Sequence, residues 1–126
     1  MKVFIVEDSP IVLEVLKRAL SSLDGIELCG NANRADTAPK RIAVVQPDIV
    51  ILDLHLEGGS GLELVGHLRR QPRCPVIAVF SNDAELGGHS VAEGADYFFD
   101  KSTGFQQMLA TLKILIATKL RVPPVT

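Results

Sequence analysis

The chain has 126 residues, of which 47% are apolar and 22% are charged, and its formal net charge at pH 7 is -2. This length fits one domain with a real hydrophobic core, so whole-chain disorder is excluded. Thirteen basic and fifteen acidic side chains create no global field that would attract nucleic acid or an anionic membrane. We therefore expect no direct nucleic-acid or membrane partner.

The amino-terminal stretch is apolar but carries Glu7, Asp8 and Glu14. It contains no uncharged run of signal-peptide length or of membrane-spanning length. The two cysteines, Cys29 and Cys74, lack the paired spacing of a zinc site and are too few for a disulfide framework. These features predict buried thiols in a reducing compartment and a cytoplasmic protein.

Short apolar runs alternate along the chain with stretches of helical period. Continuous apolar runs of this length are typical of strands that are buried on both faces. We expect strands at residues 3–6, 26–29, 49–52, 76–80 and 97–99, the second of them ending at Gly30.

The first expected helix has Ser9 as its N-cap and Pro10 at its first position. Residues spaced at the helical period form its predicted buried stripe: Val12, Val15, Leu16, Ala19 and Leu23.

Four further helices are expected at residues 35–45, 62–68, 83–93 and 105–116. Pro39 must lie in the first turn of the second helix, and Pro72 stops the third. The fourth contains Gly87 and Gly88, each of which costs about 1 kcal/mol relative to alanine. We therefore predict a fourth helix of low local stability.

Five strands that alternate with five helices predict an α/β fold with a parallel sheet covered on both faces. Right-handed crossovers between the strands follow from this arrangement. The domain is expected to occupy residues 2–119. Residues 120–126 contain Pro123-Pro124 and cannot continue the last helix, so we expect a short tail and no output domain.

Polar residues follow four of the predicted strands. Glu7 and Asp8 come after the first strand, Asp53 after the third, Ser81 after the fourth and Lys101 after the fifth. Ligands of open α/β sheets bind beyond the carboxyl ends of the strands, so these side chains are expected to meet at one edge. Each of them alone has a plainer explanation as a helix cap or a solvated group. Asp53, however, is embedded in apolar sequence, and a partly buried carboxylate must be paired or metal-bound.

Three carboxylates in one place repel each other unless a cation joins them. An all-oxygen site with few carboxylates suits Mg²⁺, which also accepts phosphate oxygens. A nearby hydroxyl and ammonium would satisfy the remaining oxygens of a phosphoryl group. A carboxylate in such a site can act as a nucleophile and form an aspartyl phosphate.

Five segments extend this interpretation: residues 3–10, 47–54, Ser60-Gly61, 76–82 and 94–101. In their order and spacing they resemble the receiver domain of two-component response regulators, over about residues 2–119. The resemblance implies a flavodoxin-like, doubly wound (βα)5 fold with strand order 2-1-3-4-5. It also implies a phosphorelay switch that receives a phosphoryl group from a histidine kinase or a histidine phosphotransfer protein.

By this resemblance, Asp53 is the phosphoacceptor, and Lys101 and Ser81 contact the phosphoryl group. The resemblance also implies a site for Mg²⁺ or Mn²⁺. Its ligands would be the side chains of Glu7, Asp8 and Asp53 and the backbone carbonyl of His55.

Ser81 and Phe98 match the pair of residues that switches conformation on phosphorylation; because Phe98 lacks a hydroxyl, its part is packing only. The sequence departs from the family pattern at Ser102, where a proline commonly follows the lysine, and at Glu57. The cis peptide that often accompanies that proline is not guaranteed at Lys101–Ser102.

Two residues beside the site could modulate the rate of dephosphorylation. The side chain of His55 is expected to face solvent, with the positioning of a hydrolytic water as the alternative. Asp83 is expected to be the N-cap of the fourth helix, with a similar role in phosphate loss as its alternative.

The fourth helix, fifth strand and fifth helix are expected to bind a downstream protein. The last helix carries Ile114 off its main apolar stripe, either as a single exposed residue or as part of such a face. The sequence leaves open whether the chain forms a homodimer.

We expect a stand-alone signalling switch that promotes its own phosphorylation and dephosphorylation but is not a turnover enzyme. A dehalogenase-like phosphatase is disfavoured because the Asp-x-Asp-x-Thr pattern is absent after the first strand. A receiver-like scaffold that acts without phosphorylation remains the main alternative, although the complete set of site residues argues against it.

Overall fold

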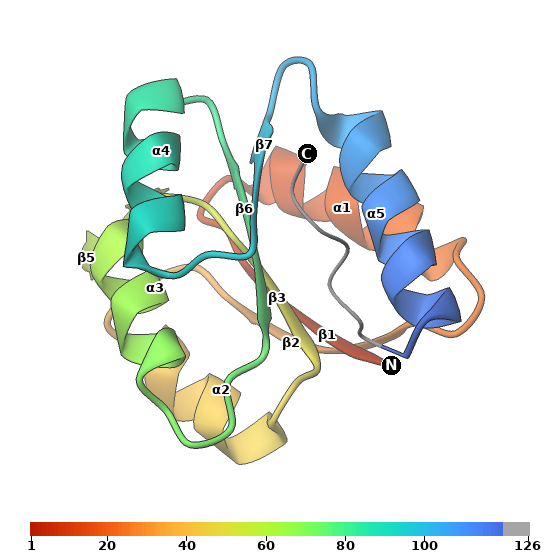
Figure 1. Ribbon diagram of the computed structural model, residues 1–126, viewed down its shortest axis with the longest axis horizontal. Coiled ribbons are helices and arrows are strands. Elements are labelled where there is room, and N and C mark those ends of the chain that lie inside the picture. The colour runs from red at the N-terminus through yellow and green to blue at the C-terminus, as the bar shows by residue number, and fades with distance from the viewer. Residues whose placement is uncertain (120–126) are drawn as a thin grey trace.

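Five parallel strands form one sheet in the computed structural model, which describes residues 1–119. They are β1 (Lys2–Val6), β2 (Glu27–Ala32), β3 (Ile49–Leu52), β6 (Val76–Ser81) and β7 (Tyr97–Asp100). Their order in the sheet is β2-β1-β3-β6-β7 (Figure 1). Since β6 and β7 are the fourth and fifth strands of this sheet, the predicted flavodoxin-like order 2-1-3-4-5 is confirmed.

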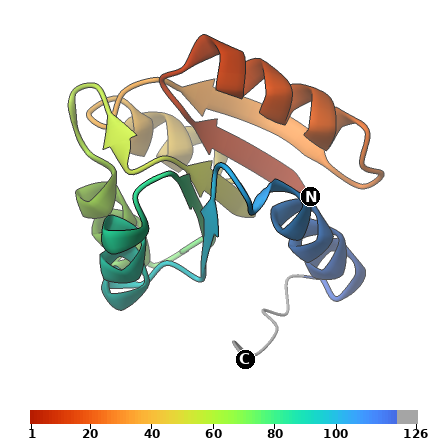
Figure 2. The same cartoon turned by 90° about the horizontal axis from the view of Figure 1, so that it is seen from above.

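Helices cover both faces of the sheet, as Figures 1 and 2 show. On one face lie α1 (Pro10–Ser21) and α5 (Phe105–Ala117). The other face is covered by α2 (Ala38–Val45), α3 (Gly61–Arg69) and α4 (Ala84–Glu93). None of the helices within residues 1–119 is both long and apolar enough to cross a lipid bilayer.

The alternation of side chains along each strand divides the core into two clusters. Phe4 and Val6 of β1 pack under α2 and α3, whereas Val3 and Ile5 pack under α1 and α5. All four are buried. A strand covered on both faces needs apolar residues at every position, which explains the continuous apolar runs.

Two elements differ in length from the expectation. β2 does not end at Gly30 but continues to Ala32, because the ladder shifts register between Val3 and Phe4 and so absorbs one extra residue of β2. α2 begins at Ala38 rather than at residue 35, with Pro39 in its first turn as predicted. Ala35 lies before the helix and donates its N–H to the Glu57 carbonyl at 2.8 Å.

The buried stripe of α1 is only partly as predicted. Leu16 is buried, but Val15 is 50% exposed, and Leu20, which the prediction omitted, is fully buried. Apolar residues occur on several sides of this helix, so the 100° spacing alone does not identify the buried side. Ser9 and Pro10 occupy the N-cap and first turn as expected.

The thiols of Cys29 and Cys74 are half-buried and unpaired, rather than fully buried as expected. Each donates a hydrogen bond to a backbone carbonyl, Cys29 to Val3 and Cys74 to Pro75. Burial raises the pKa of both thiols.

A short hairpin between β3 and α3 was not predicted. It pairs β4 (His55–Leu56) with β5 (Gly59–Ser60) in antiparallel fashion. These strands have two residues each, which is too short for a periodic signal. The predicted tail, residues 120–126, lies outside the described residues.

Candidate functional site

The sheet brings the polar residues of its strand ends together at one edge. Glu7 follows β1 and is 2% exposed, and Asp53 follows β3 and is 6% exposed. Asp8, next to Glu7, is exposed. Ligand oxygens of Glu7, Asp8 and Asp53 all lie within 4.8 Å of one another. The predicted gathering of carboxylates at this edge is therefore present.

Lys101 bridges the two buried carboxylates of this acidic cluster. Its Nζ lies 2.8 Å from Oε1 of Glu7 and 2.7 Å from Oδ2 of Asp53. The remaining oxygens also accept hydrogen bonds from the backbone, Glu7 from the N–H of Ser9 at 3.2 Å and Asp53 from the N–H of His55 at 3.3 Å. The two buried carboxylates are thus paired, as buried charge requires.

The ionisation of the cluster follows from burial and pairing. Burial raises the pKa of Glu7, and the hydrogen bond from Lys101 only partly opposes this. Burial also acts to lower the pKa of Lys101, but hydrogen bonds to Asp53 and Glu7 outweigh it and hold this pKa above the usual range. Lys101 is therefore charged at neutral pH.

The donor set fits a divalent cation. Three carboxylates, of Glu7, Asp8 and Asp53, face a single ammonium group, that of Lys101, so two negative charges remain uncompensated. All the available ligand atoms are oxygens, which suits Mg²⁺ or Mn²⁺. The exposure of Asp8 leaves one side of the cluster open to solvent, as an ion that keeps several waters requires.

Ser81 and Phe98 lie on the same face of the sheet. Ser81 is the last residue of β6 and is fully buried, and its Oγ accepts a hydrogen bond from the N–H of Asp83 at 3.4 Å. Phe98 of β7 pairs in register with Val79 of β6, two residues before Ser81. Because alternate residues share a face, the Phe98 ring and the Ser81 hydroxyl lie beneath the same helix, α4.

His55 and Asp83 meet at the rim of the site. Nε2 of His55 lies 2.9 Å from Oδ2 of Asp83, and the imidazole is exposed. Asp83 also caps α4, since its Oδ1 accepts a hydrogen bond from the N–H of Leu86 at 2.9 Å. The predicted cap is confirmed, and so is the solvent-facing imidazole. Sequence reasoning missed the pairing of the two residues, because no local pattern relates positions so far apart in the chain.

The loop after Lys101 is closed by Asp100. Its Oδ1 accepts a hydrogen bond from the N–H of Ser102 at 2.8 Å and another from the Ser102 hydroxyl. These bonds lower the pKa of Asp100. No peptide bond within residues 1–119 is cis, so the Lys101–Ser102 bond is trans.

Gly61 explains the close approach of α3 to the loop that follows Asp53. A Cβ atom at position 61 would overlap the Asp53 carbonyl oxygen and the backbone of Leu54. The Gly61 N–H donates to the Leu54 carbonyl at 3.1 Å, and Ser60 caps the helix by accepting from two backbone N–H groups. The Ser60-Gly61 pair therefore fixes α3 directly against the segment that carries Asp53.

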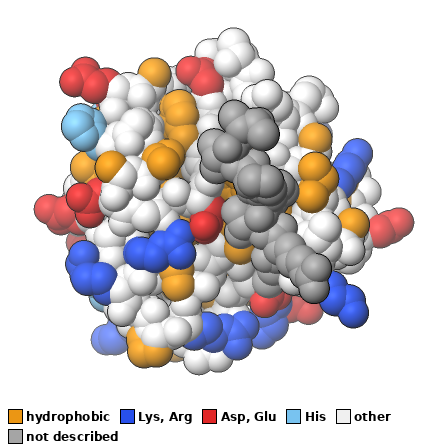
Figure 3. Space-filling model, viewed as in Figure 1, with side chains coloured by type: hydrophobic (Ala, Val, Ile, Leu, Met, Phe, Trp, Pro, Cys, Tyr) orange, Lys and Arg blue, Asp and Glu red, His pale blue; other side chains and the backbone are white. Residues whose placement is uncertain are grey.

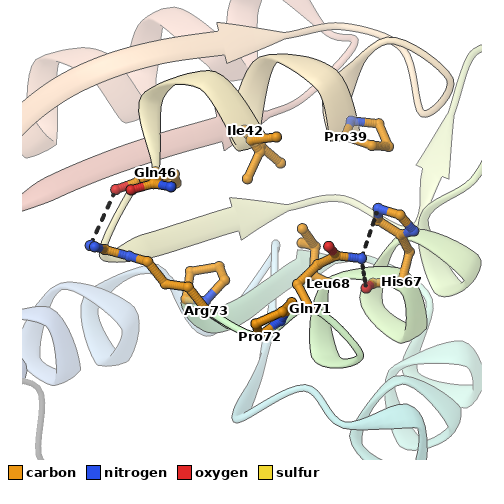
Figure 4. Close-up of a pocket in the computed structure, with 11 residues that line it drawn as sticks. Pro39, Ile42, Gln46, His67, Leu68, Gln71, Pro72 and Arg73 are labelled. Carbon is orange, nitrogen blue, oxygen red and sulfur yellow. Dashed lines mark hydrogen bonds between the residues drawn. The ribbon is translucent and has the colours of Figure 1, made fainter.

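One groove lies next to the acidic cluster, and a cavity elsewhere on the molecule lies apart from it. An open groove lined by Asp8, His55, Glu57 and Leu86 adjoins it. A separate cavity of about 250 Å³ lies between α2 and α3, with Ile42, Leu68 and several prolines in its wall (Figure 4). It contains none of the residues of the acidic cluster.

Comparison with known proteins agrees with this architecture. A family model described as the response regulator receiver domain matches residues 3–113. The chain is 28% identical over 115 residues to the DNA-binding transcriptional activator EvgA of Escherichia coli (strain K12), which covers 90% of the chain and 56% of EvgA. The chain thus spans little more than half the length of this relative.

Solved structures are similar over nearly the whole chain. The BeF3-activated N-terminal receiver domain of Klebsiella pneumoniae RstA superposes with a TM-score of 0.81 at 30% identity, over 92% of the chain and 98% of that domain. The response regulatory domain of mrkE, also from Klebsiella pneumoniae, superposes with a TM-score of 0.86 over 94% of the chain and 97% of that domain. At 19% identity it supports the fold alone. The parallel five-stranded sheet, its acidic edge and the family match over residues 3–113 agree, and the chain belongs to the response regulator receiver domains of bacterial two-component signalling.

Proposed function

We propose that Asp53 accepts a phosphoryl group from a histidine kinase or a histidine phosphotransfer protein, with Mg²⁺ or Mn²⁺ as the cofactor. The observation that carries the proposal is the position of the Lys101 ammonium, 2.7 Å from Asp53 and 2.8 Å from Glu7. The ammonium holds the Asp53 carboxylate in one orientation, and Asp8 leaves the cluster open on one side.

The transfer forms a bond between a carboxylate oxygen of Asp53 and phosphorus while the bond between phosphorus and the donor nitrogen breaks. Glu7, Asp8, Asp53 and the backbone carbonyl of His55 would hold the metal ion, which supplies positive charge opposite the phosphoryl oxygens when it is bound. Lys101 can keep one phosphoryl oxygen paired by turning from the Asp53 carboxylate to the phosphate. Ser81 would donate its hydroxyl hydrogen to another oxygen.

A small phosphodonor tests the reaction without the natural partner. Incubation with acetyl phosphate and Mg²⁺ should increase the intact mass by one phosphoryl group. The product should be labile at high pH, as an acyl phosphate is. The modification should be absent from Asp53→Asn and absent when a chelator removes the metal.

Asp24→Asn is the matched control, because Asp24 is an exposed carboxylate in the loop between α1 and β2. It removes the same charge elsewhere and should be phosphorylated like the wild type. A folded wild type that takes up no phosphoryl group would instead favour a receiver-like scaffold that acts without phosphorylation.

We propose that the signal leaves through the surface formed by α4, β7 and α5, to a downstream protein or to a second copy of the chain. On this surface Val91 of α4 is 49% exposed and Ile114 of α5 is 46% exposed. Figure 3 shows apolar side chains over both helices on this side of the molecule. These exposed apolar side chains support a partner-binding face. A change at the site could reach this face, because Asp83 links Ser81 to the first turn of α4.

The chain would act as a switch that promotes its own phosphorylation and dephosphorylation, and not as a turnover enzyme. Its acidic cluster can support this chemistry with residues of the receiver alone. From the sequence we also predict that the chain acts as a stand-alone cytoplasmic regulator and that it does not contact nucleic acid directly.

A further inference from the structure

Gly87 of α4 lies directly against the ring of Phe98. A Cβ atom at position 87 would lie 2.6 Å from Cε1 and Cζ of the ring and 2.7 Å from Cδ1. Real Cβ atoms essentially never approach another heavy atom within 3.0 Å. The ring therefore fills the space that any side chain at this position would need.

The adjacent glycine of the same helix is different. A Cβ atom at Gly88 would meet no atom within 4 Å. Both glycines weaken α4 by the same intrinsic propensity, but only Gly87 gains a packing contact from its missing side chain. Positions 87 and 88 therefore differ in packing and not in helix propensity.

The backbone of α4 forms regular hydrogen bonds on both sides of Gly87. The N–H of Gly87 donates to the Asp83 carbonyl at 2.8 Å, and its carbonyl accepts from the buried Ser90 hydroxyl at 2.6 Å. Gly87 and Ser90 are the buried residues of this helix, and both are small. These small residues let the helix pack closely against β7, so a methyl group at position 87 must push the Phe98 ring and the helix apart.

The ring also lies on the same side of the sheet as Ser81. Phe98 pairs with Val79, and Ser81 follows two residues later on the same face of β6. Ser81 is in turn linked to α4, since its Oγ accepts from the N–H of Asp83, the N-cap residue. Gly87 thus contacts the ring from the helix, and Ser81 lies on the same face of the sheet, hydrogen-bonded to the N-cap residue of that helix.

We propose that Gly87 is a positioning residue that seats the Phe98 ring and thereby couples the state of the acidic site to the outer surface of α4. The seating, that is, the placement of the Phe98 ring by Gly87, follows from packing alone. The coupling, that is, the link from the acidic site to α4, rests on the proposed phosphorylation of Asp53. Phe98 and α4 then move together, because the ring and the Gly87 backbone have no free space between them.

The seating is tested in the unphosphorylated protein with Gly87→Ala, and Gly88→Ala is the matched control. Each adds one methyl group to the same helix and removes one glycine. Gly88→Ala should raise the melting temperature by about 3 °C and leave the NMR resonances of the Phe98 ring unchanged. Gly87→Ala should shift those ring resonances and the β7 amides, and should fail to raise the melting temperature.

A smaller residue at position 98 provides the rescue. Measured against Phe98→Leu alone, the double variant Phe98→Leu/Gly87→Ala should show the gain in melting temperature that Gly87→Ala lacks in the wild-type background, because the methyl group no longer meets a ring. If Gly87→Ala behaves like Gly88→Ala in both measurements, the seating is refuted, whatever phosphorylation does.

The coupling is tested by comparing amide shifts of α4 before and after treatment with acetyl phosphate and Mg²⁺. Gly88→Ala should retain the full change, and Gly87→Ala should retain less than half of it while still taking up one phosphoryl group. A full change in phosphorylated Gly87→Ala overturns the coupling. A wild type that takes up no phosphoryl group overturns the proposed function and the coupling together, and leaves the seating to be decided by the first experiment.

Discussion

The Nε2 atom of His55 lies 2.9 Å from Oδ2 of Asp83, and this contact joins the loop after Asp53 to the first turn of α4. The second oxygen of the same carboxylate caps α4 by accepting the N–H of Leu86. The cap and the imidazole together lower the pKa of Asp83, the cap more strongly. One side chain therefore connects the rim of the acidic site to the helix that we expect to transmit the signal.

His55→Ala should shorten the lifetime of the proposed phosphoryl group on Asp53. The imidazole contacts Asp83 and lines the groove beside the acidic cluster, so its removal should ease the access of water to the acyl phosphate while leaving Asp83 free to cap α4. We expect phosphate release to become faster by about threefold, a loss of under 1 kcal/mol in barrier. Release of inorganic phosphate from the loaded protein measures this rate.

His89→Ala is the control for this substitution, because His89 is an exposed histidine on α4 away from the rim. Its rate should equal that of the wild type. A His55→Ala protein whose phosphoryl group lasts as long as in the wild type, or longer, contradicts the shielding role.

Lys101→Met should destabilise the fold at neutral pH. It leaves the buried carboxylates of Glu7 and Asp53 without their shared cation, which costs about 3 kcal/mol when one partner of a buried pair is removed. Urea unfolding measures the loss, and Lys113→Met, at an exposed position of α5, should cost little.

The loss of folding stability in Lys101→Met should also depend on pH and be smaller at lower pH. The pKa of Glu7 is already raised by burial and rises further without the ammonium. A group with a raised pKa in the folded state contributes stability that is complete below its unfolded pKa, 4.5, and that is lost as pH rises through the folded pKa. The defect should therefore shrink as the pH is lowered from 7 toward 5, and a constant defect would argue against this cause.

Ser102→Ala should raise the pKa of Asp100 toward its usual range. The Ser102 hydroxyl is the largest cause of the lowered pKa, and the backbone N–H of residue 102 remains in the variant, so part of the effect should persist. Because the pKa is lowered in the folded state, the stability from Asp100 is present above its unfolded pKa and is lost as pH falls through the folded value. Carboxyl NMR titration measures the shift, and Thr103→Ala should leave the Asp100 pKa in place.

Amide hydrogen exchange should be faster in α4 than in α5. α4 buries only Gly87 and Ser90, whereas α5 buries Met108, Leu112 and Leu115. Local opening is easiest where few apolar contacts are lost. The difference should be measured before and after phosphorylation, which should alter the protection of α4; equal protection of both helices would count against a mobile output helix.

The sequence predicted the sheet well because its strands are buried on both faces. Runs such as Ile49–Leu52 have no polar residue to interrupt them, and the order of strands and helices then leaves few topologies. The carboxyl-end rule placed Glu7 and Asp53 at one edge, and the structure brings them together there. The exposure of Val15 shows where periodicity was insufficient, since α1 has apolar residues on more than one side.

What the sequence determined by itself is the class of fold, the family match and the set of chemical groups at the strand ends, because these depend on local pattern and chain order. Tertiary structure alone decided which of those groups touch. Lys101 pairs with both buried carboxylates, His55 reaches Asp83, and the Phe98 ring occupies the space left by Gly87. These contacts join residues far apart in the chain, and their geometry depends on how closely each helix packs on the sheet, which no local spacing encodes.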